Sequence, residues 1–217
     1  MENRKHTSLK DLAQALGVSI PTVSRALKDS PEISRELCAK AKALAKEMNY
    51  RPNPFAMSLR KNAPRIIGVI VPDIVTHFFA SILNGIENMA IANGYFVIIT
   101  TSHESYEHEK RNIENLVNMR VEGIIACLSQ ETTDFSHISA LKDINMPLIL
   151  FDRVCLTDQF SSVVADGVQS AQMATQHLLD NGSKRVAFIG GANHLDIVKR
   201  RKHGYLEALR ENRIPIE

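Results

Sequence analysis

The chain has 217 residues, enough for one mid-sized domain and a smaller one, and residues 1–62 carry 12 basic against 6 acidic side chains while the remainder is mildly acidic. Its three cysteines, Cys38, Cys127 and Cys155, are too scattered for a disulfide framework, and no apolar run suits a signal peptide or a membrane span. We therefore expect a soluble cytoplasmic protein with a basic N-terminal region that is suited to a polyanion, or that is simply a solvated helical surface.

The first fifty residues predict three short helices. Ser8 precedes an apolar periodic run and is followed three residues later by Asp11, which is a capping-box pattern, and Gly17 ends that run. Ser19 is placed to cap a second helix, and Ser34 to cap a third. Two helices joined by a short turn with a glycine, and buttressed by a third, are typical of a helix-turn-helix domain.

Residues 49–65 (NYRPNPFAMSLRKNAPR) are rich in proline and asparagine, which favours a linker. Within them Asn53 is a possible cap and Pro54 a suitable first helical residue, so residues 54–60 predict a helix of under two turns. A helix this short is marginal alone because nucleation is costly. It would form only when something packs on it.

Beyond residue 65, apolar runs alternate with amphipathic stretches. Strands are predicted at 66–71, 95–100, 123–128, 147–151, 162–165 and 185–190, and helices include 78–90, 168–179 and 198–209. This alternation predicts an α/β fold with a parallel sheet that helices cover on both faces. Ligands of such sheets bind beyond the carboxyl ends of the strands.

The motifs LKDLAQALGVSIPTVSRAL, PEIS, NYRPN, AMSLR, IIGVIVPDI, GIIA, PLILFDR, VVADG, RVAFIGG and RRKHGYLEAL occur in this order. The chain from about Ser8 onward thereby resembles the LacI/GalR (lactose repressor) family of bacterial transcription regulators. The resemblance implies a small all-α helix-turn-helix domain, a core like type I periplasmic sugar-binding proteins, and a homodimer on palindromic double-stranded operator DNA. A small-molecule effector, a sugar or a nucleobase, would control operator affinity. Repression is the family's commoner mode.

The implied domains are a helix-turn-helix domain at 1–52, a hinge helix and linker at 53–63, an effector-core N-subdomain at 64–161 and part of a C-subdomain at 162–217. The family's core continues well beyond the length of this chain. We therefore expect both subdomains, and the effector cleft between them, to be incomplete, whether the chain is a fragment or a truncated protein.

The resemblance implies that the second helix reads bases with Ile20, Pro21 and Arg25. An arginine suits this role because it donates two hydrogen bonds to guanine O6 and N7; the alternative is a surface arginine without a partner. Leu59 matches a leucine that is wedged between base pairs, or else it is a small contact between domains. The further DNA-binding candidates are Ser8, Ser19, Thr22, Ser24, Ser34, Ala56 and Arg60.

Four positions depart from the family's pattern. Pro21 has no side-chain donor where other members carry a polar residue, and Lys28 replaces an asparagine and offers a phosphate contact instead. Leu37 and Cys38 replace a Thr-Arg pair, which indicates a packing role.

The implied effector-binding residues are Asp73, Phe79, Asp152, Arg153 and Arg201. Charged groups suit sugar hydroxyls or a purine edge, and a phenyl face stacks on a ring; Arg153 is placed to orient Asp152. Other roles stay open: Phe79 as hydrophobic core, Asp73 as a helix cap, and Arg201 as a solvated charge.

Two other function classes compete with a regulator. A solute-binding protein of the same core fold, without a regulatory role, would carry an export signal and no basic head. An α/β enzyme is disfavoured because the chain lacks a GxGxxG turn, a P-loop and a GxSxG elbow. The histidines show no metal-ligand spacing, so we expect neither a metal nor another cofactor.

Overall fold

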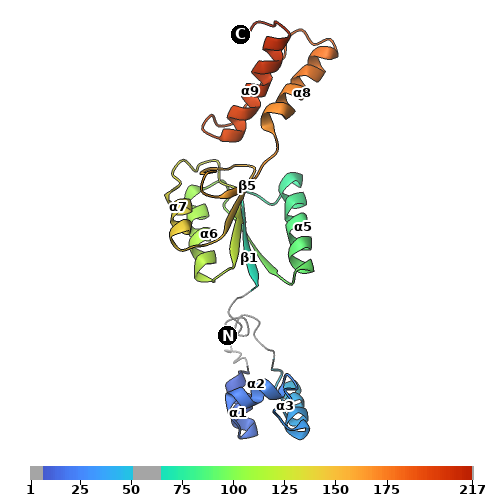
Figure 1. Ribbon diagram of the computed structural model, residues 1–217, viewed down its shortest axis with the longest axis vertical. Helices are drawn as coiled ribbons and strands as arrows, with labels where there is room; N and C mark the ends of the chain where they lie inside the picture. Colours follow the sequence, from blue (N-terminus) through green and yellow to red (C-terminus); the bar gives the residue numbers. More distant parts are fainter. Residues whose placement is uncertain (1–6, 51–64, 217) are drawn as a thin grey trace, which may run out of the picture. The chain divides into compact units, whose positions relative to one another are not determined.

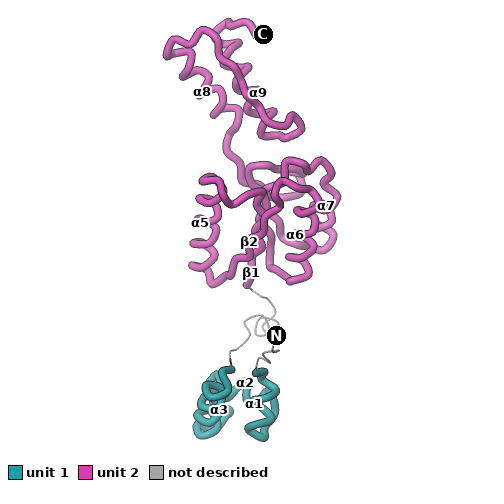
Figure 2. Tube along the Cα trace, turned by 180° about the vertical axis from the view of Figure 1, so that it is seen from behind, with its two compact units in different colours: residues 1–63 teal, residues 64–217 magenta. Residues whose placement is uncertain are grey.

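The computed structural model of the protein describes residues 7–50 and 65–216, and it divides the chain into two compact units, residues 1–63 and 64–217 (Figure 2). In the first unit, residues 7–50 form the head, with helices α1 (Leu9–Leu16), α2 (Ile20–Ala26) and α3 (Arg35–Glu47). In the second, residues 65–216 form the sheet unit. The predicted hinge helix at 54–60 lies outside the described residues.

The head helices begin at the polar residues that the sequence predicted as caps. The Ser8 hydroxyl accepts a hydrogen bond from the Asp11 N–H (3.3 Å), and the Asp11 carboxylate accepts one from the Ser8 N–H (2.8 Å), which completes the capping box. Ser19 and Ser34 each accept a backbone N–H from the first turn of α2 and α3. These caps are confirmed. Gly17 ends α1 with a left-handed φ of 65°, which costs glycine little.

Small side chains let the three head helices pack closely. Leu12 and Val23 are fully buried at the centre of the head. Cys38 is buried in contact with Ala26 and Ala41, where α2 meets α3. The packing role predicted for Cys38 is confirmed, and the head therefore has a core of its own despite its small size.

The sheet unit alternates strands and helices in the predicted manner. Its elements are β1 (Ile66–Val71), α5 (His77–Ala92), β2 (Phe96–Thr101), α6 (Tyr106–Asn118), β3 (Gly123–Ala126), α7 (Ser136–Asp143), β4 (Leu148–Phe151), β5 (Ser161–Val163), α8 (Gly167–Asp180) and α9 (Asp196–Glu211). Five parallel strands pair in the order β2-β1-β3-β4-β5. The predicted fold class, a small helical domain joined to a parallel α/β core, is confirmed.

Helices cover both faces of this sheet, α5 one face and α6 and α7 the other (Figure 1). Successive side chains along each strand point to opposite faces of the sheet, so they pack alternately against the two helical layers. Val69 and Val71 of β1 pack in the cluster of α5, whereas Ile66 and Ile70 pack in the cluster of α6 and α7. Both layers are thus built from the apolar runs that predicted the strands.

The strand predicted at 185–190 is wrong. Residues 185–190 are not part of a strand, and the Ile189 side chain is 96% exposed. A strand satisfies its backbone groups only by pairing, and no strand among the described residues lies beside this segment. The segment is held on α9 instead: the Tyr205 hydroxyl donates to the Val186 carbonyl (2.8 Å), and the Phe188 ring stacks on Tyr205.

The run at 162–165 forms a shorter strand, β5, which pairs with β4 in the same sheet as β1–β4. Residue 162, the expected start of a C-subdomain, falls within β5, and the division into subdomains stays a prediction because residues 64–217 form one compact unit. Helices α8 and α9 lie side by side (Figures 1 and 2). They approach closely at Gly204, where an added Cβ would overlap the Val168 carbonyl. None of the helices in the described part of the chain is long and apolar enough to cross a membrane.

Candidate functional site

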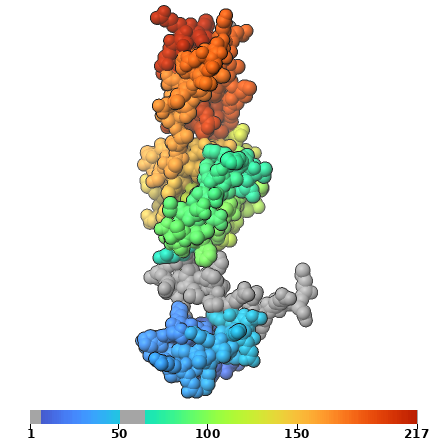
Figure 3. All heavy atoms as spheres, turned by 90° about the vertical axis from the view of Figure 1, so that its right-hand side faces the viewer, coloured from blue at the N-terminus to red at the C-terminus, as the bar shows by residue number. Residues whose placement is uncertain are grey.

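Helix α2 turns the predicted base-reading residues outward. Val23 and Ala26 are fully buried, so the opposite side of α2 faces outward from the head, whose atoms are blue in Figure 3. Ile20 is 39% exposed, and Pro21 and Arg25 are also exposed. The three residues that the sequence assigned to base reading thus share the outer side of one helix.

The other DNA-binding candidates of the head are serines and a threonine at the starts of its helices and on α2. Ser8, Ser19 and Ser34 are exposed caps, and each hydroxyl oxygen is engaged by a backbone N–H. The Ser19 and Thr22 hydroxyl oxygens lie 2.8 Å apart and are joined by one hydrogen bond. Ser24 is half-buried on α2. The Ser8 hydroxyl, besides accepting the Asp11 N–H, donates to the Asp11 carboxylate (2.8 Å).

A carboxylate that the sequence reading missed pairs with the principal candidate. Arg25 Nη1 lies 2.9 Å from Glu32 Oε2, and the two side chains are 60% and 66% exposed. Glu32 lies in the loop between α2 and α3, seven residues from Arg25, so helical spacing does not predict the contact. The open question over Arg25 is thereby answered in part: it is a surface arginine, but it has a partner.

Three DNA-binding candidates, Ala56, Leu59 and Arg60, lie outside the described residues, as does the whole predicted hinge at 53–63. Their assignment stays a prediction from the resemblance.

In the sheet unit, the candidate residues follow strands at one edge. Asp73 follows β1, Asp152 and Arg153 follow β4, and Glu104 follows β2. Parallel strands bring their carboxyl ends to the same edge. Asp152 (φ 59°) and Glu104 (φ 61°) are both left-handed, a conformation that costs energy for residues other than glycine and clusters at functional sites.

Arg153 is held by Glu104 rather than by Asp152. Its two terminal nitrogens donate to the two Glu104 oxygens at 2.5 and 2.9 Å, and Nη1 also donates to the Leu128 carbonyl (3.2 Å). Burial raises the pKa of Glu104, but hydrogen bonds from Arg153 and the Gln130 N–H outweigh it, so the net pKa is lowered. The predicted orienting contact from Arg153 to Asp152 is replaced by an anchor to a residue that the sequence reading did not single out.

Asp152 is half-buried, and burial raises its pKa although the charges of Arg153 and Arg201 oppose the rise. Arg201 comes from α9, so residues from two distant parts of the sequence lie within electrostatic reach of Asp152. Arg201 itself is exposed and borders a cavity of about 260 Å³ with Phe188 and Tyr205. Carboxylate and guanidinium groups near one another are suited to polar, hydroxyl-rich ligands.

Asp73 and Phe79 take roles that differ from their assignment to a ligand. Asp73 Oδ1 accepts the Val75 N–H (3.0 Å), which closes a local turn, and α5 is capped at Thr76 without a side-chain bond. Phe79 is only 6% exposed and packs edge-on against Phe151, so little of its ring is left for a ligand. Of the two roles considered for Phe79, the structure favours a place in the hydrophobic core.

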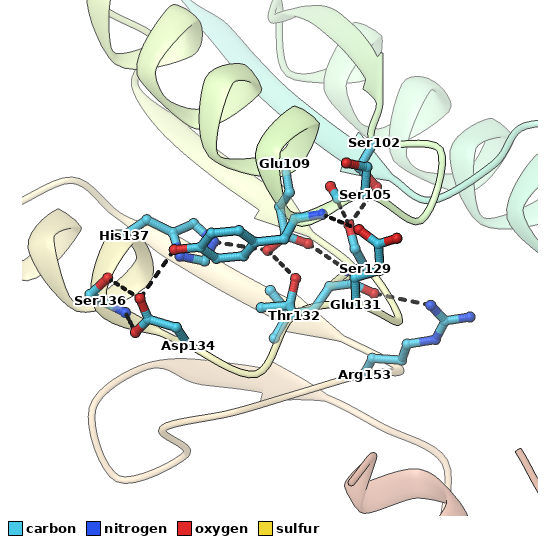
Figure 4. Close-up of polar contacts among 12 residues, drawn as sticks. Ser102, Ser105, Glu109, Ser129, Glu131, Thr132, Asp134, Ser136, His137 and Arg153 are labelled. Atoms are coloured by element: carbon cyan, nitrogen blue, oxygen red, sulfur yellow. Dashed lines mark hydrogen bonds and ion pairs between the residues drawn. The ribbon is translucent and has the colours of Figure 1, made fainter. Parts of the chain in front are cut away.

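A buried polar network supports the loop after β3 (Figure 4). The Glu109 carboxylate of α6 is fully enclosed and receives the Ser129 N–H, the Thr132 hydroxyl (2.9 Å) and His137 Nε2 (2.8 Å). Ser129 in turn donates to the Ser102 hydroxyl (2.8 Å) after β2. The same loop carries the Leu128 carbonyl, which accepts a hydrogen bond from Arg153. The network therefore holds in place a loop to which Arg153 is bound.

Comparison with known families agrees with this division of the chain. Residues 8–53 match the family described as bacterial regulatory proteins, lacI family. Residues 65–217 match the family described as periplasmic binding proteins and sugar binding domain of LacI family. The resemblance drawn from the motifs is confirmed.

Individual proteins show the same likeness over nearly the whole chain. Catabolite control protein A of Priestia megaterium is 32% identical over 97% of this chain, and the ribose operon repressor of Bacillus subtilis (strain 168) is 31% identical over 97%. The crystal structure of the lac repressor dimer bound to operator and the anti-inducer ONPF matches 97% of this chain and 64% of its own, with a TM-score of 0.75 and 26% identity. The chain spans 63% and 62% of the lengths of the two curated relatives.

Proposed function

This chain belongs to the LacI family of bacterial regulatory proteins, and from that membership we propose that it is a sequence-specific DNA-binding transcriptional regulator, acting as a repressor. The observation that carries the proposal is α2, whose outer side presents Ile20, Pro21 and Arg25 from a frame of capped helices. A rigid helix with an arginine and an apolar side chain on one face suits the major groove.

In the proposed mechanism, Arg25 donates to guanine O6 and N7, and Ile20 contacts a thymine methyl. The Ser and Thr hydroxyls and Lys28 contact phosphates, which position the head without specifying sequence. Two copies of the chain act as a homodimer on a palindromic operator. The hinge residues Ala56, Leu59 and Arg60 then enter the minor groove, where Leu59 is the wedge. Chromosomal DNA as the target places the protein in the cytoplasm.

The sheet unit is proposed to sense a small polar effector, a sugar or a nucleobase. Support comes from Asp152 and Arg153 at the carboxyl edge of the sheet and from Arg201, whose charge reaches Asp152. Asp73 closes the turn beside this edge. The proposed role involves no catalysis, no metal and no other cofactor. The match of residues 8–53 to regulatory proteins favours a regulator over a solute-binding protein without a regulatory role.

The test is selection of operator DNA by the full chain from a pool of random duplexes, followed by affinity measurements on the enriched sequence. We expect a palindrome, with affinity that falls steeply as salt rises because bound cations are released from the duplex. Arg25→Ala should lower the preference at one base pair of each half-site by about 1–3 kcal/mol. A pool without enrichment, or equal losses on operator and random DNA, would contradict the proposal or its assignment to Arg25, respectively.

A further inference from the structure

The loop after α2 places a carboxylate on the proposed reading face. Glu32 lies 2.9 Å from Arg25 Nη1, and both side chains are largely exposed. This contact is tertiary, since Arg25 belongs to α2 and Glu32 lies between α2 and α3. The pair therefore forms only when the loop folds back along the helix.

A carboxylate on a surface that meets phosphates weakens the attraction to any duplex, whatever its sequence. The same loop carries a second carboxylate, Asp29, which pairs with Lys42 of α3 (2.5 Å) and is 65% exposed. The two acidic side chains thus share a loop and nearly the same exposure. They differ in their partner: one holds the proposed base-reading residue and the other does not.

We propose that Glu32 is a specificity-determining residue that holds the Arg25 guanidinium in position for guanine and discourages its use on phosphates. The proposal rests on the proposed function of the head in reading DNA. An arginine has five N–H donors in a fixed fork, so two of them bind guanine O6 and N7 while another stays on Glu32.

Two physical effects follow from the pair. First, an arginine already held by a neighbour loses less side-chain freedom on binding, which favours the correct base. Second, a guanidinium that is already paired with Glu32 attracts a phosphate less, so its contribution to binding random DNA is weakened. Both effects act through Arg25, and both raise the ratio of operator to random-duplex affinity.

The experiment measures the affinities of the full chain for the selected operator duplex and for an arbitrary duplex of the same length, by fluorescence anisotropy. The variant is Glu32→Gln and the matched control is Asp29→Asn, which removes the same charge from the same loop. Asparagine tolerates the left-handed backbone at this position (φ 54°). Circular dichroism of each variant checks that the head stays folded.

For Glu32→Gln, the ratio of operator to random-duplex affinity should fall by about threefold, the upper range for an exposed ion pair. The loss should map to the base pair read by Arg25. In an Arg25→Ala background the same substitution should leave the ratio unchanged, and Asp29→Asn should strengthen binding to both duplexes equally.

If Glu32→Gln and Asp29→Asn behave alike, Glu32 is an ordinary surface charge and the inference is overturned. It is also overturned if the effect of Glu32→Gln persists without Arg25, because Glu32 would then act on DNA directly. If the parent protein enriches no sequence at all, the proposed function itself fails, a result distinct from the other two.

Discussion

The head and the sheet unit assemble their candidate surfaces in opposite ways. In the head, the residues on the reading face lie within six consecutive positions of one helix, and only Glu32 joins them from a loop. In the sheet unit, the candidate ligand-binding residues are far apart in the sequence: Glu104 follows β2, Asp152 follows β4, and Arg201 lies within α9.

The two candidate surfaces therefore depend on different kinds of contact. The head depends on helix caps and on a few small buried side chains, so its geometry is local. The sheet unit depends on a layer of apolar packing and on the buried Glu109 network that holds the loop after β3. Substitutions that break one unit should therefore leave the other nearly unaffected.

The largest effect is expected for Leu116→Ala in α6. Leu116 is 1% exposed and packs in the cluster beneath the sheet, so its truncation should destabilise the sheet unit by about 3 kcal/mol. Hydrogen exchange, followed by mass spectrometry, should show lost protection in residues 65–216 and unchanged protection in 7–50. An equal loss in both units would show that the two fold as one cooperative body.

Glu109→Gln should lower the free energy of unfolding of the sheet unit by about 2 kcal/mol, because the amide cannot accept hydrogen bonds from all three buried donors. Urea unfolding measures it. Glu114→Gln on the exposed side of the same helix is the control and should change stability little. Equal effects of the two variants would mean that the network contributes nothing beyond its charge.

In the head, Ser8→Ala should cost about 1 kcal/mol, since it removes the capping box of α1. The measurement is the thermal unfolding of the head, monitored by helical circular dichroism at the lower transition or by hydrogen exchange of residues 7–16. Ser8→Thr keeps the capping oxygen and should retain most of the stability. If Ala and Thr variants match, the cap observed at Ser8 has no energetic role.

The smallest effect concerns the anchor between Glu104 and Arg153 and depends on pH. The pKa of Glu104 is lowered in the folded protein, so its pair adds stability above the unfolded pKa and loses it as pH falls through the folded one. Since the Glu104 side chain is 40% exposed, we expect about 0.5 kcal/mol. The free energies of urea unfolding of Glu104→Gln and of the parent should differ at neutral pH and converge as the pH falls through the lowered pKa of Glu104. A constant difference would exclude the pair as the cause.

Several features of the fold followed from local pattern alone. Ser8, Ser19 and Ser34 were predictable as caps because capping acts within one helical turn. The strands at 66–71 and 147–151 were predictable because each is a short continuous run of apolar residues. The strand predicted at 185–190 shows the limit of that logic. Its composition suits a strand, but pairing is a property of two segments.

The candidate residues divide in the same way. Helical periodicity, which depends on neighbours along the chain, is enough to predict the face of α2 that carries Ile20 and Arg25. Long-range packing is needed to bring Arg25 to Glu32, to anchor Arg153 on Glu104 and to enclose Phe79 in the core. Those outcomes depend on loops and helices that return from distant positions, and no spacing within a single element encodes where they arrive.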